Sequence, residues 1–293
     1  MTTGIKVSKP GESIFSNDIR NLSFHHDYTM LKYHSNTTTT STLNAGDTES
    51  SATVSHSLGY VPAFLVYYKR SDESVERLIP DIPYGVGFDL YPWAYATTTG
   101  ITVGYSSADP YNQISILTTD YYNSSTGRGN VYTGNHPVSG TLNGAMYFPG
   151  VTLNKDQSIV SAGIDYRVYS KGSGTGDVLM RTTGIDEDNT GDFSGYPFGR
   201  DQTTASTSQS QSLGSTPFTF EVNVKSQVEE IIARAGWSSG NAMAFLVLDN
   251  GSPSDVYVGD GLGAGIDVSK LIITKTGSLT ISFRVIIFKD KIA

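Results

Sequence analysis

The chain has 293 residues, no cysteine and a formal net charge of −8, and only 16% of its residues are charged. The lack of cysteine excludes disulfides, thiolate metal sites and cysteine nucleophiles, and the acidic balance argues against nucleic acid as a main partner. At 38% hydrophobic residues, a chain of this length can bury a substantial core, and the length favours two domains.

The apolar pattern favours neither membrane insertion nor secretion through a signal peptide. The N-terminus has no apolar stretch of the kind that a signal peptide contains. The longest apolar runs, 242–248 and 285–288, fall far short of the roughly 20 residues that span a bilayer.

The first part of the chain predicts a series of short strands. Residues 35–51 are almost wholly Ser, Thr, Asn, Gly and acidic, which predicts a loop. The segment 63–68 is rich in β-forming residues and predicts a strand. Turn residues at a short, regular spacing then separate further strands, expected at 93–97, 101–105 and 113–118.

A second strand series is expected after an irregular stretch. Residues 119–158 hold much Gly, Asn, Tyr and Pro and predict irregular structure. Residues 218–224 alternate, so that their apolar side chains share one face. Other strands are expected at 164–169, 178–182, 242–248 and 279–288, the last of them as a central strand.

One helix is expected, over about 226–235. Ser226 and Glu229 have the spacing of a capping box, in which the serine side chain caps a backbone N–H and the glutamate reaches back. Gly236 is placed to end this helix in a left-handed turn. The sequence therefore predicts a mainly β protein with two β-sandwich or jelly-roll domains and one short helix.

Three separated motifs carry a first resemblance, and they are Gly4–Gly11, His56–Leu65 and Ile286–Asp290. Together they resemble small structural proteins of tailed-phage genomes, described as tail-fibre or virion proteins, in which these motifs belong to one compact β domain. The long gap in this chain implies a first domain over 1–121 and 271–293, with an N-terminal arm, and a second domain over 122–270 inserted into it. Insertion is tolerated where chain ends lie close together at a surface.

Three further motifs lie in the inserted region, and they are Ser161–Val168, Asn223–Ile232 and Trp237–Phe245. Together they resemble a jelly-roll module of phage and bacterial surface proteins, where the module is commonly a non-catalytic appendage. The resemblance implies a fold, and it does not imply an activity.

The acidic stretch Asp-Glu-Asp-Asn-Thr-Gly-Asp is the clearest candidate for metal chemistry. Its oxygen-bearing residues loosely match a calcium loop, because calcium takes several oxygen ligands folded around one turn. Pro197, however, stands where the bidentate glutamate is required. Calcium binding by Asp186, Asp188, Thr190 and Asp192 is one hypothesis, a solvated turn is the favoured interpretation, and no cofactor is expected.

Aromatic residues gather at Tyr84, Phe88, Tyr91, Trp93 and Tyr95. Such rings stack on the apolar faces of sugars and carry polar atoms that form hydrogen bonds. The same residues could form sandwich core or a contact between identical subunits, and we favour core or subunit contact over glycan binding.

A structural turn is expected at His56, Gly59, Tyr60 and Pro62. His56 is expected to form a structural hydrogen bond there, while Gly59 and Pro62 fix the bend.

No catalytic constellation is recognisable in the sequence. A glycoside hydrolase needs two carboxylates that face one sugar bond, and no such pair lies in a motif that we can assign. The glycine-rich segment 172–176 lacks the Lys-Ser/Thr of a phosphate loop, so it predicts a hairpin turn. The expectation is a protein that is not an enzyme.

The resemblances imply a virion structural protein, as a fibre, spike or capsid decoration that serves particle assembly and host-surface adhesion. Its expected partners are other virion proteins, further copies of itself and host-surface glycan, without nucleic acid or membrane insertion. Its expected location is the virion, after assembly in the host cytoplasm. The alternative is an exported carbohydrate-binding module without catalysis, and a polysaccharide-cleaving enzyme ranks third because an acid pair is missing.

Overall fold

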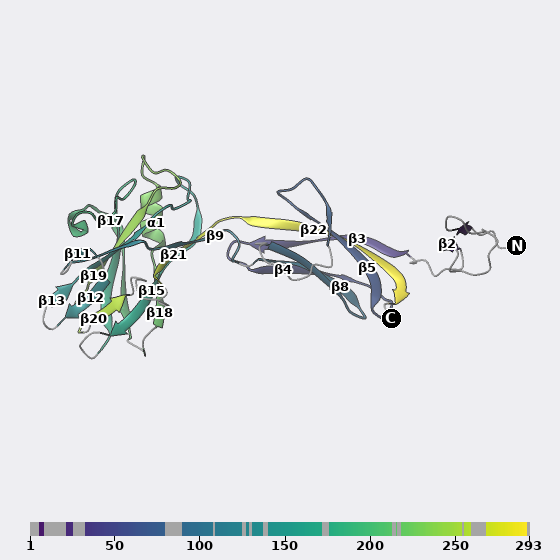
Figure 1. Ribbon diagram of the computed structural model, residues 1–293, viewed down its shortest axis with the longest axis horizontal. Coiled ribbons are helices and arrows are strands. Elements are labelled where there is room, and N and C mark those ends of the chain that lie inside the picture. The colour runs from purple at the N-terminus through teal and green to yellow at the C-terminus, as the bar shows by residue number, and fades with distance from the viewer. Residues whose placement is uncertain are drawn as a thin grey trace. The chain divides into compact units, whose positions relative to one another are not determined.

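The computed structural model is mainly β, with many strands and a single α-helix in the described part of the chain (Figure 1). This confirms the expected mainly β class. The structure describes residues 6–8, 22–25, 33–79, 90–107, 109–124, 127–128, 131–136, 140–171, 176–212, 215, 218–253, 255–258 and 268–291.

The chain divides into two compact units, which we call unit 1 (residues 1–109 and 278–293) and unit 2 (residues 110–277). In unit 1, a four-stranded sheet has the order β3-β22-β5-β6 and a three-stranded sheet has the order β4-β8-β7. The described strands of unit 1 are β1 (Lys6–Ser8), β2 (Leu22–His25), β3 (Tyr33–Asn44), β4 (Glu49–Ser55), β5 (Pro62–Arg70), β6 (Arg77–Leu78), β7 (Leu90–Ala96), β8 (Gly100–Ser107) and β22 (Ser278–Lys291).

Strand β22 is a central strand, as the sequence predicts, because it lies between β3 and β5 in the sheet. Its alternate residues from Leu279 to Ile287 are buried, as a period of two requires for a strand with one face on the core. Ring contact between Tyr68 of β5 and Tyr105 of β8, with centroids 5.9 Å apart, joins the two sheets of this sandwich.

The loop expected over 35–51 is wrong, because most of this polar segment forms β3, the turn after it and the start of β4. Eleven residues of β3 pair with β22, from Asn44 opposite Ser278 to Tyr33 opposite Phe288. Threonine is β-branched and suits a half-buried pleated surface. Both faces of β3 carry hydroxyl side chains, because Thr39 and Ser41 stand opposite the buried Phe283 and Ile281, and this hides the alternation from a hydropathy pattern.

Unit 2 is a second sandwich. Its six-stranded sheet has the order β11-β10-β14-β19-β16-β17, and its seven-stranded sheet consists of six strands in the order β13-β12-β20-β15-β21-β9 together with β18. Strand β18 pairs with β15. Its described elements are β9 (Gln113–Leu117), β10 (Asp120–Asn123), β11 (Gly127–Arg128), β12 (Val131–His136), β13 (Gly140–Leu142), β14 (Gly144–Phe148), β15 (Ile159–Lys171), β16 (Val178–Ile185), a 3₁₀ helix (Pro197–Gly199), β17 (Gln202–Gln211), β18 (Phe218–Asn223), α1 (Lys225–Ile232), β19 (Met243–Asp249), β20 (Asp255–Val258) and β21 (Lys270–Lys275).

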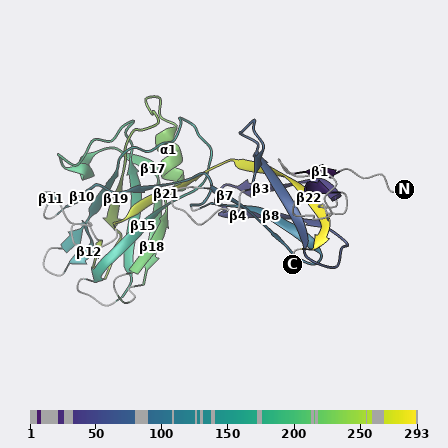
Figure 2. The ribbon, with the colours of Figure 1, turned by 45° about the vertical axis from the view of Figure 1, so that its right-hand side comes forward.

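The core of unit 2 lies between these two sheets and is closed along one side by α1. Phe148 and Phe245 of the six-stranded sheet and Tyr166 of the seven-stranded sheet are fully buried in one cluster. Val228 and Ile231 of α1 belong to the same cluster. Both ribbon views show the helix alongside β17 (Figures 1 and 2).

The unit boundaries differ from those that the sequence suggested, which were 121/122 and 270/271. Strand β21 pairs on one side with β15 of the inserted region, where Leu271 stands opposite Ile164, and on its other side with β9, where Thr274 stands opposite Gln113. Because a paired strand cannot leave its sheet without breaking the ladder, both strands belong to the inserted unit. The stretch 119–158, expected to be irregular, also forms β10 to β14 within that unit.

The expected helix is present, but its ends are built differently from the prediction. It spans Lys225–Ile232, and its N-cap Val224 provides no side-chain cap, while Asn223 Oδ1 accepts a hydrogen bond from the N–H of Lys225 at 3.0 Å. Ser226 therefore lies inside the helix, and Glu229 forms an ion pair with Lys225 at 3.7 Å instead of a capping box. The cap residue after the last turn is Ala233, in right-handed conformation. No helix in the described ranges is long and apolar enough to cross a membrane.

Tyr166 predicts a pH dependence for the stability of unit 2. Its ring is fully buried, its hydroxyl contacts Thr182 Oγ1 at 3.2 Å, and burial raises the pKa of Tyr166 above its ordinary value. The native state therefore keeps a proton that the unfolded chain loses above about pH 10. The contribution of Tyr166 to the free energy of unfolding is therefore constant below about pH 10. Above that pH it decreases by about 1.4 kcal/mol per pH unit.

The replacement Tyr166→Phe should remove this alkaline slope, at the cost of one buried hydrogen bond worth about 1 kcal/mol at neutral pH. Urea unfolding between pH 7 and pH 11 measures both effects. Tyr196→Phe is the control, because Tyr196 is 60% exposed. Equal alkaline slopes for the wild type and Tyr166→Phe would contradict the assignment.

Candidate functional site

Three of the five aromatic residues singled out in the sequence lie on one face of the edge strand β7. Tyr91, Trp93 and Tyr95 occupy alternate positions, so their side chains leave the strand on the same side. The other two, Tyr84 and Phe88, lie outside the described residues. The register sets each ring against one residue of β8, in the pairs Tyr91 with Ser106, Trp93 with Gly104 and Tyr95 with Thr102.

This face points away from the core of unit 1. Ile101, Val103 and Tyr105 of β8 are at most 3% exposed and face the other sheet. The residues that alternate with them along β8, Thr102, Gly104 and Ser106, therefore lie on the outer face, together with the rings of β7. Tyr95 is 52% exposed there. The aromatic residues of β7 thus do not belong to the core between the sheets, which was one of the expected roles.

Trp93 is held against the sheet by a glycine and a hydroxyl group. A Cβ atom on Gly104 would lie 2.2 Å from Trp93 Cζ2, so only glycine leaves room for the indole in this position. The indole Nε1 donates a hydrogen bond to Ser106 Oγ at 2.8 Å. The rings of Trp93 and Tyr95 are nearly parallel, with centroids 5.8 Å apart and planes 9° apart.

Hydroxyl groups continue this face across β8 to β4. Thr102 Oγ1 and Thr53 Oγ1 lie 3.1 Å apart in an exposed pair. Glu49 stands opposite Ser106 at the end of the pairing. We call the outer surface made by Tyr91, Trp93, Tyr95, Thr102, Gly104, Ser106 and Thr53 the β7 aromatic face.

The expected turn at His56 to Pro62 joins distant parts of unit 1. His56 Nδ1 accepts a hydrogen bond from the N–H of Leu58 at 3.4 Å, and Gly59 has a φ of +74°, which favours glycine. Tyr60 Oη donates to the carbonyl oxygen of Lys289. Pro62 begins β5 and stands opposite the end of β22. The turn therefore ties the start of β5 to the C-terminal strand.

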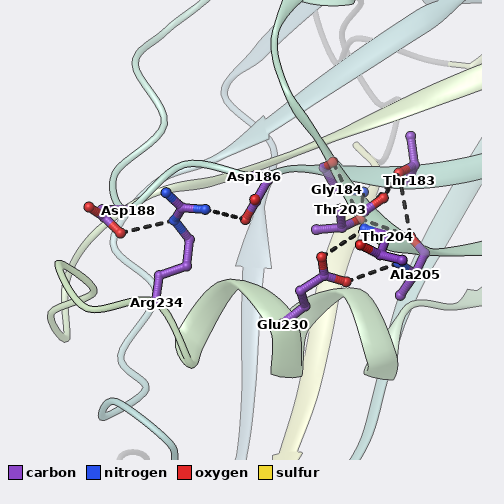
Figure 3. Close-up of polar contacts among 9 residues, drawn as sticks. All are labelled: Thr183, Gly184, Asp186, Asp188, Thr203, Thr204, Ala205, Glu230 and Arg234. Carbon is purple, nitrogen blue, oxygen red and sulfur yellow. Dashed lines mark hydrogen bonds and ion pairs between the residues drawn. The ribbon is translucent and has the colours of Figure 1, made fainter.

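The calcium hypothesis for the acidic loop finds no support in its geometry. Asp186 and Asp188 take the guanidinium of Arg234 as their positive partner, at 2.6 Å and 2.9 Å (Figure 3). Thr190 is buried, and its N–H donates to the Ala242 carbonyl. Asp192 Oδ1 accepts from the N–H of Ser194 in its own turn. Among the described residues, no group of three or more His, Cys, Asp or Glu side chains could hold a metal ion.

The acidic loop is instead fastened to the end of α1 and to the chain that follows it. The two carboxylates raise the pKa of Arg234, so the guanidinium stays charged. Gly236 serves this contact, because a Cβ atom there would lie 2.3 Å from Asp188 Oδ2. Asn241 Nδ2 also donates to the Asp188 carbonyl at 2.9 Å. Gly236 is therefore needed for close approach, and it does not end the helix as expected.

Glu230 fastens α1 to β17 on the other side (Figure 3). Its two carboxylate oxygens accept hydrogen bonds from successive backbone N–H groups, of Thr204 at 2.7 Å and Ala205 at 2.9 Å. The pairing of β16 with β17 shifts register at this point. A bulge leaves backbone donors without a partner in the ladder, and Glu230 supplies the acceptors.

The replacement Glu230→Gln should lower the free energy of unfolding by about 1–2 kcal/mol, because an amide NH₂ would face a backbone donor. Glu229→Gln is the matched control on the same helix, where the 3.7 Å pair with Lys225 is exposed and should change stability by less than about 0.5 kcal/mol. Urea unfolding measures both variants. A loss for Glu229→Gln as large as that for Glu230→Gln would contradict this role of the carboxylate.

The segment Gly236–Gly240 fits the spacing G-x-S-x-G of a serine nucleophile, which the sequence reasoning missed. That motif requires a strand before the serine and a helix after it. In this chain α1 comes before the segment and β19 comes after it, and Ser238 is exposed in a turn. The structural context is the reverse of a nucleophile elbow.

A second aromatic cluster, also missed from the sequence, lies on the outer face of the six-stranded sheet. Tyr122 contacts three rings edge-on, with centroids 6.0 Å to 6.3 Å apart. Phe193 is buried, whereas Tyr196 is 60% exposed. The rings pack edge to face and cover one another, as in a small core. The three rings that Tyr122 contacts edge-on are those of Phe193, Tyr196 and Phe198.

Comparison with known proteins gives no family assignment. No family model matches the chain, and no curated protein matches its sequence.

Proposed function

We propose that the chain is a non-catalytic virion structural protein, a fibre, spike or capsid decoration that serves particle assembly and adhesion to the host surface. Its partners would be other virion proteins, further copies of itself and glycan on the host. The N-terminal arm would attach the chain to the particle, which leaves the sandwich of unit 1 and the whole of unit 2 available for display.

The supporting observation is the way in which two of the resemblance motifs meet. The turn at His56 to Pro62 and strand β22 are far apart in sequence, with 229 positions between Tyr60 and Lys289. They nevertheless share one sandwich, through the bond from Tyr60 Oη to Lys289 and the pairing of Leu65 with Ile286. In the phage structural proteins that the motifs resemble, these motifs belong to one β domain. If this chain is a protein of that kind, its two motifs must also lie in one domain, and both lie in unit 1.

Deletion of the chain from the particles of its source culture tests this proposal. Loss of particle stability or infectivity, restored by the full chain supplied in trans, is the expected result. Particles that form with the usual yield and infect with the usual efficiency without the chain would overturn it.

An exported carbohydrate-binding module is the second candidate, and the β7 aromatic face favours it. Stacked rings beside hydroxyl groups would serve a free glycan-binding protein as well as a particle. The two candidates separate by location, because an exported module would be found in the medium or on cells, away from particles.

A further inference from the structure

The strongest unassigned surface is the β7 aromatic face, and we propose that it binds an uncharged hexopyranose glycan. This inference rests on the proposed adhesive function and names its ligand class. It also reverses the ranking drawn from sequence, in which core or subunit contact stood above glycan binding.

The position of Trp93 is the first argument. The indole is fixed over Gly104 and bonded to Ser106, while the parallel ring of Tyr95 beside it stays half exposed. Rings that are fixed before binding lose little conformational freedom when a ligand arrives. The C–H face of a pyranose is apolar and suits a fixed aromatic surface, whereas its rim needs polar partners.

The hydroxyl groups beside the rings supply those polar partners. Thr53 and Thr102 stand next to Tyr95 along the sheet, in an exposed pair. A threonine hydroxyl both donates and accepts hydrogen bonds, as does the hydroxyl group of a sugar. The arrangement is therefore a strip of rings bordered by a strip of hydroxyls, both on rigid strands.

Charge selects the kind of glycan. Among the described outward positions of β4, β7 and β8, Glu49 is the one charged residue, and it stands at the Tyr91 end. The chain as a whole carries a net charge of −8. An anionic polysaccharide would meet like charge without any cation to pair with. An uncharged glycan avoids this cost.

Binding can be measured on the full chain through its own fluorescence. The chain has two tryptophans, and Trp237 is 3% exposed in the core of unit 2, so a change caused by a surface ligand reports Trp93. The probes are a printed array of neutral, uronic-acid and sialic-acid oligosaccharides, followed by titration with the neutral oligosaccharides that bind. Neutral oligosaccharides should bind and quench or shift the emission.

Variants then locate the site. Trp93→Ala should weaken binding at least about tenfold, as calorimetry measures it. Trp93→Phe should keep measurable binding and lose the fluorescence response. Gly104→Ala should shift the emission of the free protein and weaken binding, because its Cβ displaces the indole. Gly195→Ala, where the added Cβ meets nothing within 4 Å, and Tyr196→Ala should stay within about twofold of the wild type.

Three results would overturn the inference: binding of acidic oligosaccharides alone or of none, binding that Trp93→Ala leaves intact, or binding that Tyr196→Ala abolishes. A fall in oligomer size with Trp93→Ala, seen by light scattering without any glycan binding, would assign the face to a second copy instead. Circular dichroism controls for folding, and Tyr95→Ala gives a second test if Trp93→Ala misfolds. Glycan binding by a chain that is absent from particles would refute the virion role and leave this inference standing.

Discussion

Phe283→Ala should lower the free energy of unfolding of unit 1 by about 3–5 kcal/mol. Phe283 is fully buried on the central strand β22, where it stands between Thr39 of β3 and Tyr68 of β5. Truncation removes the ring from the core and leaves a cavity that strands paired on both sides cannot close.

Urea unfolding followed by two signals measures this loss. The emission of the half-buried Trp93 follows unit 1, and that of the buried Trp237 follows unit 2. The unit 1 transition should move to lower urea while the unit 2 transition keeps its midpoint. Ser282→Ala, at the outward neighbour, should cost less than about 0.5 kcal/mol. A loss below 1 kcal/mol for Phe283→Ala would contradict the assigned core.

Trp237→Ala should lower the free energy of unfolding of unit 2 by a similar amount, about 3–5 kcal/mol. Its indole is 3% exposed in the main cluster, and Nε1 donates to the buried carbonyl oxygen of Leu153 at 2.9 Å. Alanine removes the ring and also leaves that carbonyl without its donor, which adds to the cost.

The two tryptophans of the chain are matched controls for one another. Trp93 lies on an outer face, so Trp93→Ala should cost unit 1 much less than Trp237→Ala costs unit 2. Trp237→Phe should fall between the wild type and Trp237→Ala, because it restores most of the volume and leaves the Leu153 carbonyl unpaired. Urea unfolding monitored by circular dichroism gives all three values. Equal losses for the two alanine variants would contradict the different burial of the two indoles.

The sequence predicts this fold well where apolar side chains alternate. Strands β5, β8, β18 and β22 follow from their patterns because their inward positions are apolar and their burial is what selects the register. Strand β19, which is buried on both faces over its first five residues, follows from its continuous apolar run. The helix follows from its apolar face. Its ends do not, because Ser226 and Glu229 have the spacing of a local cap, whereas the helix starts after Val224, whose N–H donates to the Ala162 carbonyl of β15.

Polar strands are where prediction from the sequence fails. Strand β17 contains only Gln, Thr, Ser and Ala, and no hydropathy pattern marks it. Its inward side chains are satisfied by hydrogen bonds across the edge of the sandwich, from Thr207 Oγ1 to the Asn223 carbonyl and from Gln209 Nε2 to the Glu221 carbonyl. Such bonds depend on the placement of β18, which a local pattern does not contain. Strand β3 is hidden for the same reason.

For the candidate site too, the sequence shows which residues are present, but the fold determines which of them meet. The aromatic residues of β7 stand out in the sequence, but their face, and the glycine beneath Trp93, depend on the register of β7 with β8. The spacing of the acidic loop, which is local, suggests calcium as one hypothesis beside the favoured solvated turn. Its partner Arg234 lies 46 residues from Asp188, so the cation that it holds is set by the fold.

Immunogold labelling of intact particles from the source culture, with antibody raised against the purified full chain, tests the central claim most directly. The proposed function predicts gold on particles, and its position on capsid or tail would separate decoration from fibre. Particles without gold, with the chain found on cells or free in the medium, would contradict a virion role and favour the exported glycan-binding module.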